Sequence, residues 1–192
     1  GGALPSDLVS LAGVPDLASI WIDGDNLIVG ARCTHDQVAR SANVGSAVPG
    51  LASLAAGIGD AQVRNRGTLG GSVAHADPAA DYPAALIALD AIVVTDRREV
   101  AAADFFTGLF STALEADELV TAVKFRIPER SAYVKFAHRA SKYAVVGAFV
   151  ARHKDGTSRV AITGAAASVY RAKEFEAALD GSFTADAVAG IT

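Results

Sequence analysis

Residues 64–91, RNRGTLGGSVAHADPAADYPAALIALDA, constrain the fold more than any other stretch of this chain. Two arginines lead into a turn with three glycines, a small polar and acidic passage follows, and an apolar run with helical spacing ends the stretch. Glycine accepts positive φ and has no Cβ, so several backbone N–H groups of such a turn can point into one concavity. This segment is therefore expected to place bare backbone N–H groups against an anionic ligand.

The first part of the stretch has the composition of an anion site. The N–H groups of residues 67–72 would favour a phosphate oxygen, and Thr68 and Ser72 add hydroxyl donors. Arg64 and Arg66 raise the local positive potential, toward that anion or toward a protein partner. The alternative is a plain tight turn that joins a strand to a loop. The spacing fits neither GxGxxG nor GxxxxGK[ST], and no helical pattern begins directly after the last glycine, so the turn's own amides are expected to hold the anion.

Two carboxylates follow the glycine turn. Asp77 and Asp81 would repel a phosphate at contact distance. Asp77 precedes Pro78 and is predicted to cap a helix over about 79–89, whereas Asp81 is predicted to contact a ligand through hydroxyls or amides, such as a ribityl chain or a ribose. His75 with these two aspartates is a weaker candidate for a metal site, because the three side chains lie on a loop and no fourth ligand is found beside them in the sequence. The aspartates are therefore interpreted as a helix cap and a ligand contact.

Composition narrows the class of protein. The 192 residues are 51% hydrophobic and 20% charged, which predicts a well-filled core. The net charge of −4 argues against nucleic acid or an anionic membrane as the main partner. The single cysteine, Cys33, forms no internal disulfide and fits a reducing cytoplasm. The longest apolar runs are far too short for a transmembrane segment.

The remaining pattern predicts strands and helices in segregated blocks, which is typical of an α+β fold. Thr34 is the predicted N-cap of a helix, and its neighbours Cys33 and His35 are expected to be packing or solvent-facing residues rather than ligands. A boundary is expected near Glu129. The predicted strands cover 6–12, 91–96, 117–128, 132–141, 143–156 and 158–168, with a hairpin over 18–31. The predicted helices cover 34–42, 47–57, 79–89, 171–181 and 184–191.

The stretch QVRNRGTLGGSVAHADPAADYPAALIALDA resembles the FAD-binding (medium) subunit of molybdenum hydroxylases, the family of aerobic carbon monoxide dehydrogenase and xanthine dehydrogenase. The likeness is nearer to the separate medium subunit of three-subunit bacterial enzymes than to the fused eukaryotic chain. It implies a PCMH-type FAD-binding domain over 1–129, with its first βαβ part largely missing. A small C-terminal domain over 130–192, a three-stranded antiparallel sheet with helices, is implied to follow.

FAD is the cofactor that this resemblance implies. Its pyrophosphate would lie on the turn formed by Thr68, Leu69, Gly70, Gly71 and Ser72. The family has a second glycine loop, of the Ala-Gly-Gly-x-x-Leu type, after a first βαβ segment. This chain opens GGALPSDLVSL, so that loop is expected to be absent or reduced to its edge. Half of the phosphate cradle is therefore expected to lie outside this chain.

The resemblance also implies contacts near the flavin ring. Asp81 matches the family's acidic residue on the flavin side, and Ile58 falls where the family has an apolar residue near the isoalloxazine. Val120 matches a position whose backbone approaches the ring. Tyr143 is implied as an aromatic cover, the alternative being a strand-end tyrosine of the small domain.

One departure from the family concerns the electron acceptor. The xanthine dehydrogenase branch carries a lysine near the flavin, in the strand that matches YVKFAHR. Ala137 holds the matching position, and Lys135 lies two residues away on the same strand face as a candidate substitute. This departure leaves the final acceptor open among NAD, a quinone and oxygen.

The implied function is an electron relay without a catalytic side chain of its own. Electrons would pass from a large molybdenum subunit, through [2Fe–2S] clusters on a small subunit, to FAD on this chain and then to an external acceptor. The molybdenum cofactor and the clusters belong to the partners, because one cysteine cannot ligate a cluster. A hetero-oligomer, such as a dimer of heterotrimers, is implied. The alternatives are a nucleotide-binding regulatory module and a stand-alone flavin oxidase.

Overall fold

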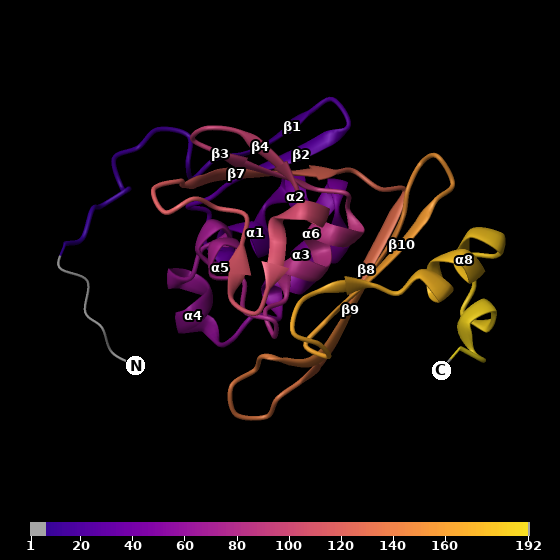
Figure 1. The fold of residues 1–192 in the computed structure, drawn as a ribbon. Coiled ribbons are helices and arrows are strands. Elements are labelled where there is room, and N and C mark those ends of the chain that lie inside the picture. Colours follow the sequence, from indigo (N-terminus) through magenta and orange to yellow (C-terminus); the bar gives the residue numbers. More distant parts are fainter. Residues whose placement is uncertain (1–6, 192) are drawn as a thin grey trace.

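A computed structural model describes residues 7–191 of the chain (Figure 1). The helices are α1 (His35–Arg40), α2 (Ala42–Ala47), α3 (Pro49–Ala56), α4 (Ala61–Arg66), α5 (Leu69–His75), α6 (Tyr82–Ala88), α7 (Ala102–Phe105) and α8 (Lys173–Gly181), with a 3₁₀ turn η1 (Asp186–Val188). The strands are β1 (Ile20–Asp23), β2 (Asn26–Gly30), β3 (Ile92–Thr95), β4 (Glu99–Ala101), β5 (Phe106–Gly108), β6 (Ser111–Thr112), β7 (Val120–Arg126), β8 (Arg130–Ala137), β9 (Ala144–Arg152), β10 (Ser158–Thr163) and β11 (Tyr170–Arg171).

A five-stranded antiparallel sheet covers one side of a helical layer. Its strand order is β1-β2-β7-β3-β4, and the helices α1 to α6 lie beneath it (Figure 1). Alternate side chains of the central strand point inward, so Val123 and Phe125 are fully buried and join one core with Leu51 of α3 and Leu86 of α6. Burial of each such side chain stabilises the fold by about 1.5–3 kcal/mol.

A second antiparallel sheet, in the order β11-β10-β9-β8, packs against the helices from another side. Strand β8 contacts α3, and β9 and β10 contact α6, so these two helices lie between the sheets. The N–H of Ala144 donates to Ala79 O, and the N–H of Gly164 donates to Pro78 O. The ends of β9 and β10 are thereby fixed beside the turn that precedes α6.

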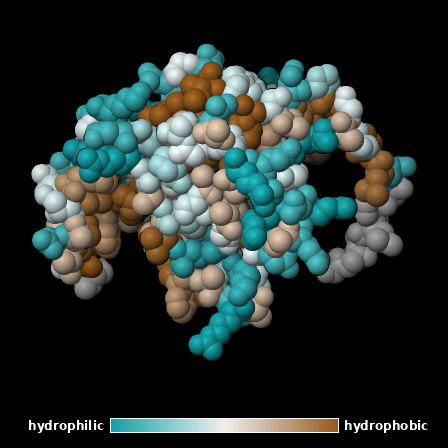
Figure 2. All heavy atoms as spheres, turned by 180° about the vertical axis from the view of Figure 1, so that it is seen from behind, coloured by the Kyte–Doolittle hydropathy of each residue, from teal (hydrophilic) through white to brown (hydrophobic). Residues whose placement is uncertain are grey.

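One face of the second sheet stays open. Val134 and Phe136 of β8 are 73% and 70% exposed, and Val146 of β9, which pairs with Phe136, is 39% exposed. The molecule seen from behind has hydrophobic and hydrophilic surface side by side (Figure 2). The side chains of β8 that point the other way, Tyr133 and Lys135, turn toward the helical layer and take part in the site described below.

The predicted α+β class is confirmed, and so are the hairpin at 18–31, the strands predicted from residue 91 onward, the amphipathic helix near 171–181 and the Thr34 cap, whereas strand β4 of the first sheet was not predicted. The second sheet has a fourth, two-residue strand beyond the three predicted. The predicted strand at 6–12 is wrong for its described part: residues 7–11 have no regular structure, and Leu8 and Val9 are 89% and 86% exposed. An apolar run forms a strand only where a partner accepts its backbone hydrogen bonds. Residue 6 lies outside the described part of the chain.

The helical predictions need correction in several places. The helix predicted over 34–42 ends at Arg40, because Ser41 takes an extended conformation and caps a new helix, α2. The helix predicted from residue 79 begins only at Tyr82. The helix predicted over 184–191 is one 3₁₀ turn. Helices α4 and α5 occupy the stretch predicted to be a glycine turn, and this change alters the site itself.

Candidate functional site

The predicted nest of free amides is not formed. Leu69 begins α5, so the two glycines after it lie in the first turn of a helix capped by the Thr68 hydroxyl. Five of the six amides from residue 67 to residue 72 donate inside the protein. The acceptors are Val63 O for Gly67, Cys33 O for Leu69, Ala31 O for Gly70, Thr68 Oγ1 for Gly71 and Thr68 O for Ser72. The prediction that these amides grip an anion is therefore wrong for those five.

The glycines serve close packing instead. A Cβ on Gly70 would lie 2.5 Å from the Cβ of Ala31, and one on Gly67 would lie 2.5 Å from Nε2 of His35. Both distances are far below van der Waals contact. The missing side chains let α5 lie directly on the segment that follows β2, and this close approach places α5 and α1 on two sides of one cavity.

That cavity has a volume of about 460 Å³, which is within the usual range of about 300–1,000 Å³ for small-molecule sites. Its wall is assembled from α1, the segment around α4, α5, the turn before α6 and the β8–β9 loop. Six of the nine predicted site residues line it: Ile58, Thr68, Gly71, Ser72, Asp81 and Tyr143. Leu69 and Gly70 belong to α5 but are buried and do not line the cavity. Val120 is the first residue of β7 and also lies outside the lining.

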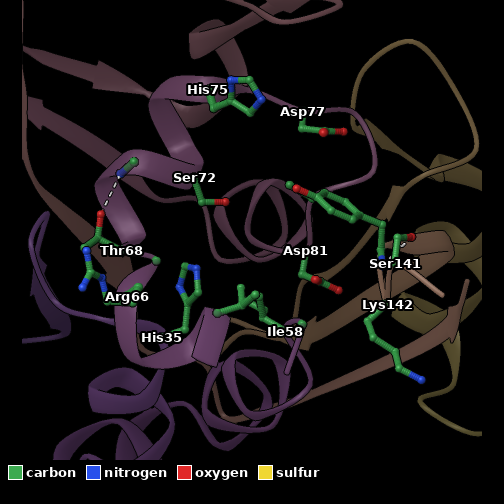
Figure 3. A pocket seen from close by; sticks show the side chains of 16 residues that line it. His35, Ile58, Arg66, Thr68, Ser72, His75, Asp77, Asp81, Ser141 and Lys142 are labelled. Carbon is green, nitrogen blue, oxygen red and sulfur yellow. Dashed lines mark hydrogen bonds between the residues drawn. The ribbon is translucent and has the colours of Figure 1, made fainter. Parts of the chain in front are cut away.

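One end of the cavity, which we call the hydroxyl end, carries hydrogen-bond donors. Arg66, Thr68 and Ser72 line it (Figure 3). The Thr68 oxygen accepts from Gly71 N at 3.2 Å, which leaves its own O–H free to donate. Arg64 has a different role from the one predicted, because its guanidinium donates to Ile58 O and Gly59 O at 3.0 and 3.2 Å and so holds the loop between α3 and α4.

His35 also belongs to the hydroxyl end, although the sequence predicted only a packing or solvent-facing residue. In Figure 3 its ring and the Ser72 side chain reach into the pocket from α1 and α5. Its Nδ1 lies 3.3 Å from the hydroxyl of Tyr82, and burial lowers the pKa of His35 to about 4. Tyr82 is fully buried, and burial raises the pKa of its phenol. Both side chains are therefore neutral at pH 7.

The other end, which we call the carboxylate end, contains Asp81, Tyr133 and Lys135. Asp81 is only 5% exposed. The Tyr133 hydroxyl donates to Oδ1 of Asp81, and Nζ of Lys135 lies 3.1 Å from Oδ2. Burial raises the pKa of Asp81, and the Tyr133 and Lys135 donors oppose that rise. The carboxylate is thus both desolvated and paired, which makes the pair sensitive to the loss of either partner.

Lys135 connects three walls of the cavity. Besides Asp81, its ammonium donates to Gly57 O at 2.9 Å and to Lys142 O at 3.0 Å. Gly57 precedes the lining residue Ile58, and Lys142 belongs to the β8–β9 loop. Lys135 therefore lies beside the lining of the cavity, where its hydrogen bonds are structural ones, and its substitution for the family's lysine near the flavin stays a prediction.

Asp77 lines the cavity. It was predicted to cap the helix that follows, but it does not cap α6. Its Oδ1 accepts from Ala79 N at 2.8 Å and closes a turn, three residues before the helix starts. In the part of the chain that the structure describes, no three His, Cys, Asp or Glu side chains gather as a metal site.

The lining suits a nucleotide that is polar at one end and flat at the other. Hydroxyl, guanidinium and imidazole donors stand at the hydroxyl end, where phosphate oxygens would find partners. Ile58, Val63, Ala80 and Tyr143 supply apolar and aromatic wall, as in sites that bind ring systems. Within residues 7–191, no helix is long and apolar enough to cross a bilayer.

Comparisons with known proteins agree with this geometry. Residues 2–129 match the family described as the FAD binding domain in molybdopterin dehydrogenase. The chain is 36% identical to the nicotine 6-hydroxylase medium subunit of Paenarthrobacter nicotinovorans, over 94% of this chain and 67% of that protein. It is 34% identical to the carbon monoxide dehydrogenase medium chain of Hydrogenophaga pseudoflava, over 97% of this chain and 69% of the relative.

Solved structures of carbon monoxide dehydrogenase and quinoline 2-oxidoreductase resemble the chain in fold as well as in sequence. Quinoline 2-oxidoreductase from Pseudomonas putida 86 superposes with a TM-score of 0.85 at 34% identity, over 92% of this chain and 65% of that one. The carbon monoxide dehydrogenase of Hydrogenophaga pseudoflava that lacks the Mo-pyranopterin moiety superposes with a TM-score of 0.82 at 37% identity, over 91% and 65%. The chain therefore spans 65% of the length of each of these two solved chains.

Proposed function

The chain belongs to the family of FAD-binding domains of molybdopterin dehydrogenases, and from this premise we propose that it is the flavoprotein part of a multi-subunit molybdenum hydroxylase. In this role it relays electrons from iron–sulfur clusters on a small partner subunit to an external acceptor. The substrate is chosen on a large molybdenum subunit. The assembly is a hetero-oligomer, such as a dimer of heterotrimers, in the cytoplasm.

FAD, when bound, supplies the redox chemistry, and the protein supplies binding, orientation and electrostatics. The hydroxyls of Thr68 and Ser72 and the guanidinium of Arg66 would hold the diphosphate from the hydroxyl end. Ile58 and Tyr143 would pack against the ring system, where they exclude water from one side. Val120 keeps its proposed place near the ring as a backbone contact.

Asp81 is proposed to face the flavin side of the nucleotide. Its carboxylate is fixed by Tyr133 and Lys135, so it can accept a hydrogen bond from a ribityl hydroxyl or a ring N–H without moving. It lies away from the phosphate donors, as charge repulsion requires. No side chain of the pocket has to act as acid, base or nucleophile for electron transfer.

The observation that carries this proposal is the cavity itself. Anion donors and a buried, paired carboxylate line one space, and six predicted flavin contacts from distant parts of the chain meet there. A regulatory module that binds a nucleotide without redox activity could use the same wall, and the reduction of the bound flavin by partner subunits distinguishes it. A stand-alone flavin oxidase would need a substrate site with a base beside the ring.

A spectroscopic experiment tests the proposal. The full-length protein is purified with and without the products of neighbouring genes, and its visible spectrum is recorded before and after addition of the substrate of the complex. Flavin bands that bleach only when the partner subunits are present support the relay. A protein without flavin bands, even after incubation with FAD, contradicts it. Bleaching by a small alcohol without partners indicates the oxidase, and bound flavin that no partner reduces indicates the regulatory module.

A further inference from the structure

We propose that His35 is a ligand-binding residue, held by Tyr82 as the neutral tautomer with its proton on Nε2, and that this N–H donates to a phosphate oxygen of the bound dinucleotide. The proposal rests on the proposed function and names one contact within that site. It concerns a residue that the sequence pattern did not single out as a ligand.

The first step is an imidazole edge that opens into the cavity and accepts or donates no hydrogen bond within residues 7–191. His35 is only 5% exposed and belongs to the cavity lining. Its Nδ1 faces the Tyr82 hydroxyl at 3.3 Å. Among residues 7–191, Nε2 has no hydrogen-bond partner, and the ring points into the pocket (Figure 3). Nε2 keeps access to the cavity, so this polar edge of an otherwise almost fully buried side chain is available to a ligand atom there.

The second step fixes the tautomer. Tyr82 is fully buried, and its only hydrogen-bond partner among the described residues is Nδ1 of His35. If Nδ1 carried the proton, the phenol would accept it and its own O–H would be left buried and unpaired, which costs free energy. The phenol therefore donates to Nδ1, and the single proton of the neutral ring resides on Nε2. The tilted contact between the two rings, with centroids 5.4 Å apart, holds this orientation.

The third step places the ligand atom. Nε2 lies beside Gly67, between the lining residues Arg66 and Thr68, at the hydroxyl end. A Cβ at residue 67 would come within 2.5 Å of Nε2, so glycine at this position keeps the imidazole edge accessible. A donor beside a guanidinium and a hydroxyl suits a phosphate oxygen rather than a flavin ring nitrogen. Because burial lowers the pKa of His35, the contact does not depend on protonation near pH 7.

The first experiment reads the tautomer directly. The full-length protein is labelled with ¹⁵N-histidine, and the imidazole nitrogen shifts are recorded without ligand and with FAD. The expected result is a His35 ring with a protonated Nε2 that does not titrate between about pH 5.5 and 8, and whose Nε2 shift moves when FAD binds. In Tyr82→Phe the tautomer preference is expected to weaken. An Nδ1–H tautomer in the wild type overturns the proposal.

The second experiment locates the contact by comparing FAD, FMN and riboflavin as probes. His35→Phe is expected to weaken FAD and FMN binding by about 10- to 100-fold, because a hydrogen bond to a charged group is lost. Riboflavin, which has no phosphate, is expected to bind the variant as it binds the wild type. His35→Gln, which keeps an N–H donor, is expected to recover part of the affinity.

Three results would separate the failure of this inference from that of the proposed function. If the wild type binds FAD but His35→Phe weakens all three probes equally, the residue only supports the fold and the phosphate contact is wrong. Unchanged FAD affinity in His35→Phe is equally decisive against it. If the wild type binds no flavin while the Nε2–H tautomer is present, the proposed function fails, and the phosphate contact fails with it.

Discussion

The two ends of the cavity are built in different ways. At the hydroxyl end, Thr68 caps α5, Ser72 lies four residues later on that helix, and Arg66 ends α4 two residues before the cap. At the carboxylate end, Asp81 meets Tyr133 and Lys135, which follow it by 52 and 54 residues. The hydroxyl and guanidinium donors of the first end come from one short segment around α5, with His35 of α1 beside them, whereas the second end exists only when β8 has docked on the helical layer. The difference predicts that the carboxylate end couples the site to global stability, whereas the hydroxyl and guanidinium donors of the other end mainly set affinity.

The strongest test of this difference between the two ends is to remove the Asp81 carboxylate. Asp81→Leu leaves the Lys135 ammonium, whose side chain is 9% exposed, without its charge partner. Loss of one member of a buried ion pair costs about 3–5 kcal/mol. The free energy of unfolding, measured by urea denaturation of the full-length protein, is expected to fall by that amount.

The control for this change is the double variant Asp81→Leu with Lys135→Met, which replaces the pair by apolar side chains. It is expected to recover most of the lost stability, because no unpaired charge remains. A single variant within about 1 kcal/mol of the wild type would show that solvent reaches the pair and that the carboxylate end does not couple to the fold.

The second prediction uses pH to test the hydroxyl end. The ordinary pKa of histidine is 6.5, and burial lowers that of His35 to about 4. Between these values the unfolded chain binds a proton that the folded protein refuses, so stability falls as the pH drops from 6.5 toward 4. The total loss attributable to His35 is expected to be about 3 kcal/mol, since each pKa unit corresponds to about 1.4 kcal/mol.

The matched measurement is the same denaturation series on His35→Gln, which has no group that titrates in this range. Its stability is expected to depend less steeply on pH between 6.5 and 4, whatever its absolute value. Parallel curves for the wild type and the variant would mean that His35 takes up its proton at the same pH in the folded and unfolded chain, and the lowered pKa of His35 would then be wrong.

The sequence predicted these two ends unequally. Thr68, Ser72 and Asp81 stand in one contiguous motif, so the likeness to a known family singled them out. Lys135 was placed near the site, but its bonds to Gly57 O and Lys142 O depend on the register of β8 and on the path of two loops. No local pattern encodes such contacts, because they form between segments far apart in the chain.

The misread glycine stretch has a physical reason too. Three glycines within five residues indicate a turn from propensity alone, since glycine disfavours a helix interior by about 1 kcal/mol. Here the Thr68 cap and the packing of α5 on Ala31 outweigh that cost. His35 was overlooked because its role depends on Tyr82, which lies 47 residues later and touches it only in the folded protein. The proposed boundary after residue 129 stays a prediction.

The third prediction asks whether the hydroxyl end depends on the close approach of α5. Gly70→Ala puts a Cβ 2.5 Å from that of Ala31 and 3.0 Å from its backbone, which has little room to move. The overpacking is expected to cost about 1–3 kcal/mol of stability. Gly71→Ala is the control on the same helix, because its Cβ meets only Thr68 Oγ1 at 3.0 Å and the gain in helix propensity offsets this contact. Thermal unfolding of both variants checks the difference, and equal losses would show that the packing against Ala31 is unimportant.

The smallest expected effect is a loss of FAD affinity in Ser72→Ala, and it tests one hydroxyl donor of the hydroxyl end directly. Ser72 lines the cavity on α5, and alanine is at least as good a helix former, so Ser72→Ala is expected to leave the unfolding free energy within about 0.5 kcal/mol of the wild type. It removes one hydroxyl donor, which is worth about 1 kcal/mol, and FAD is therefore expected to dissociate about five-fold more readily. Quenching of flavin fluorescence on titration measures the affinity. Ser53→Ala, on the exposed side of α3 and outside the cavity, is the matched control. If both serine variants bind FAD alike, the Ser72 hydroxyl makes no contact and the phosphate donors must lie elsewhere in the pocket.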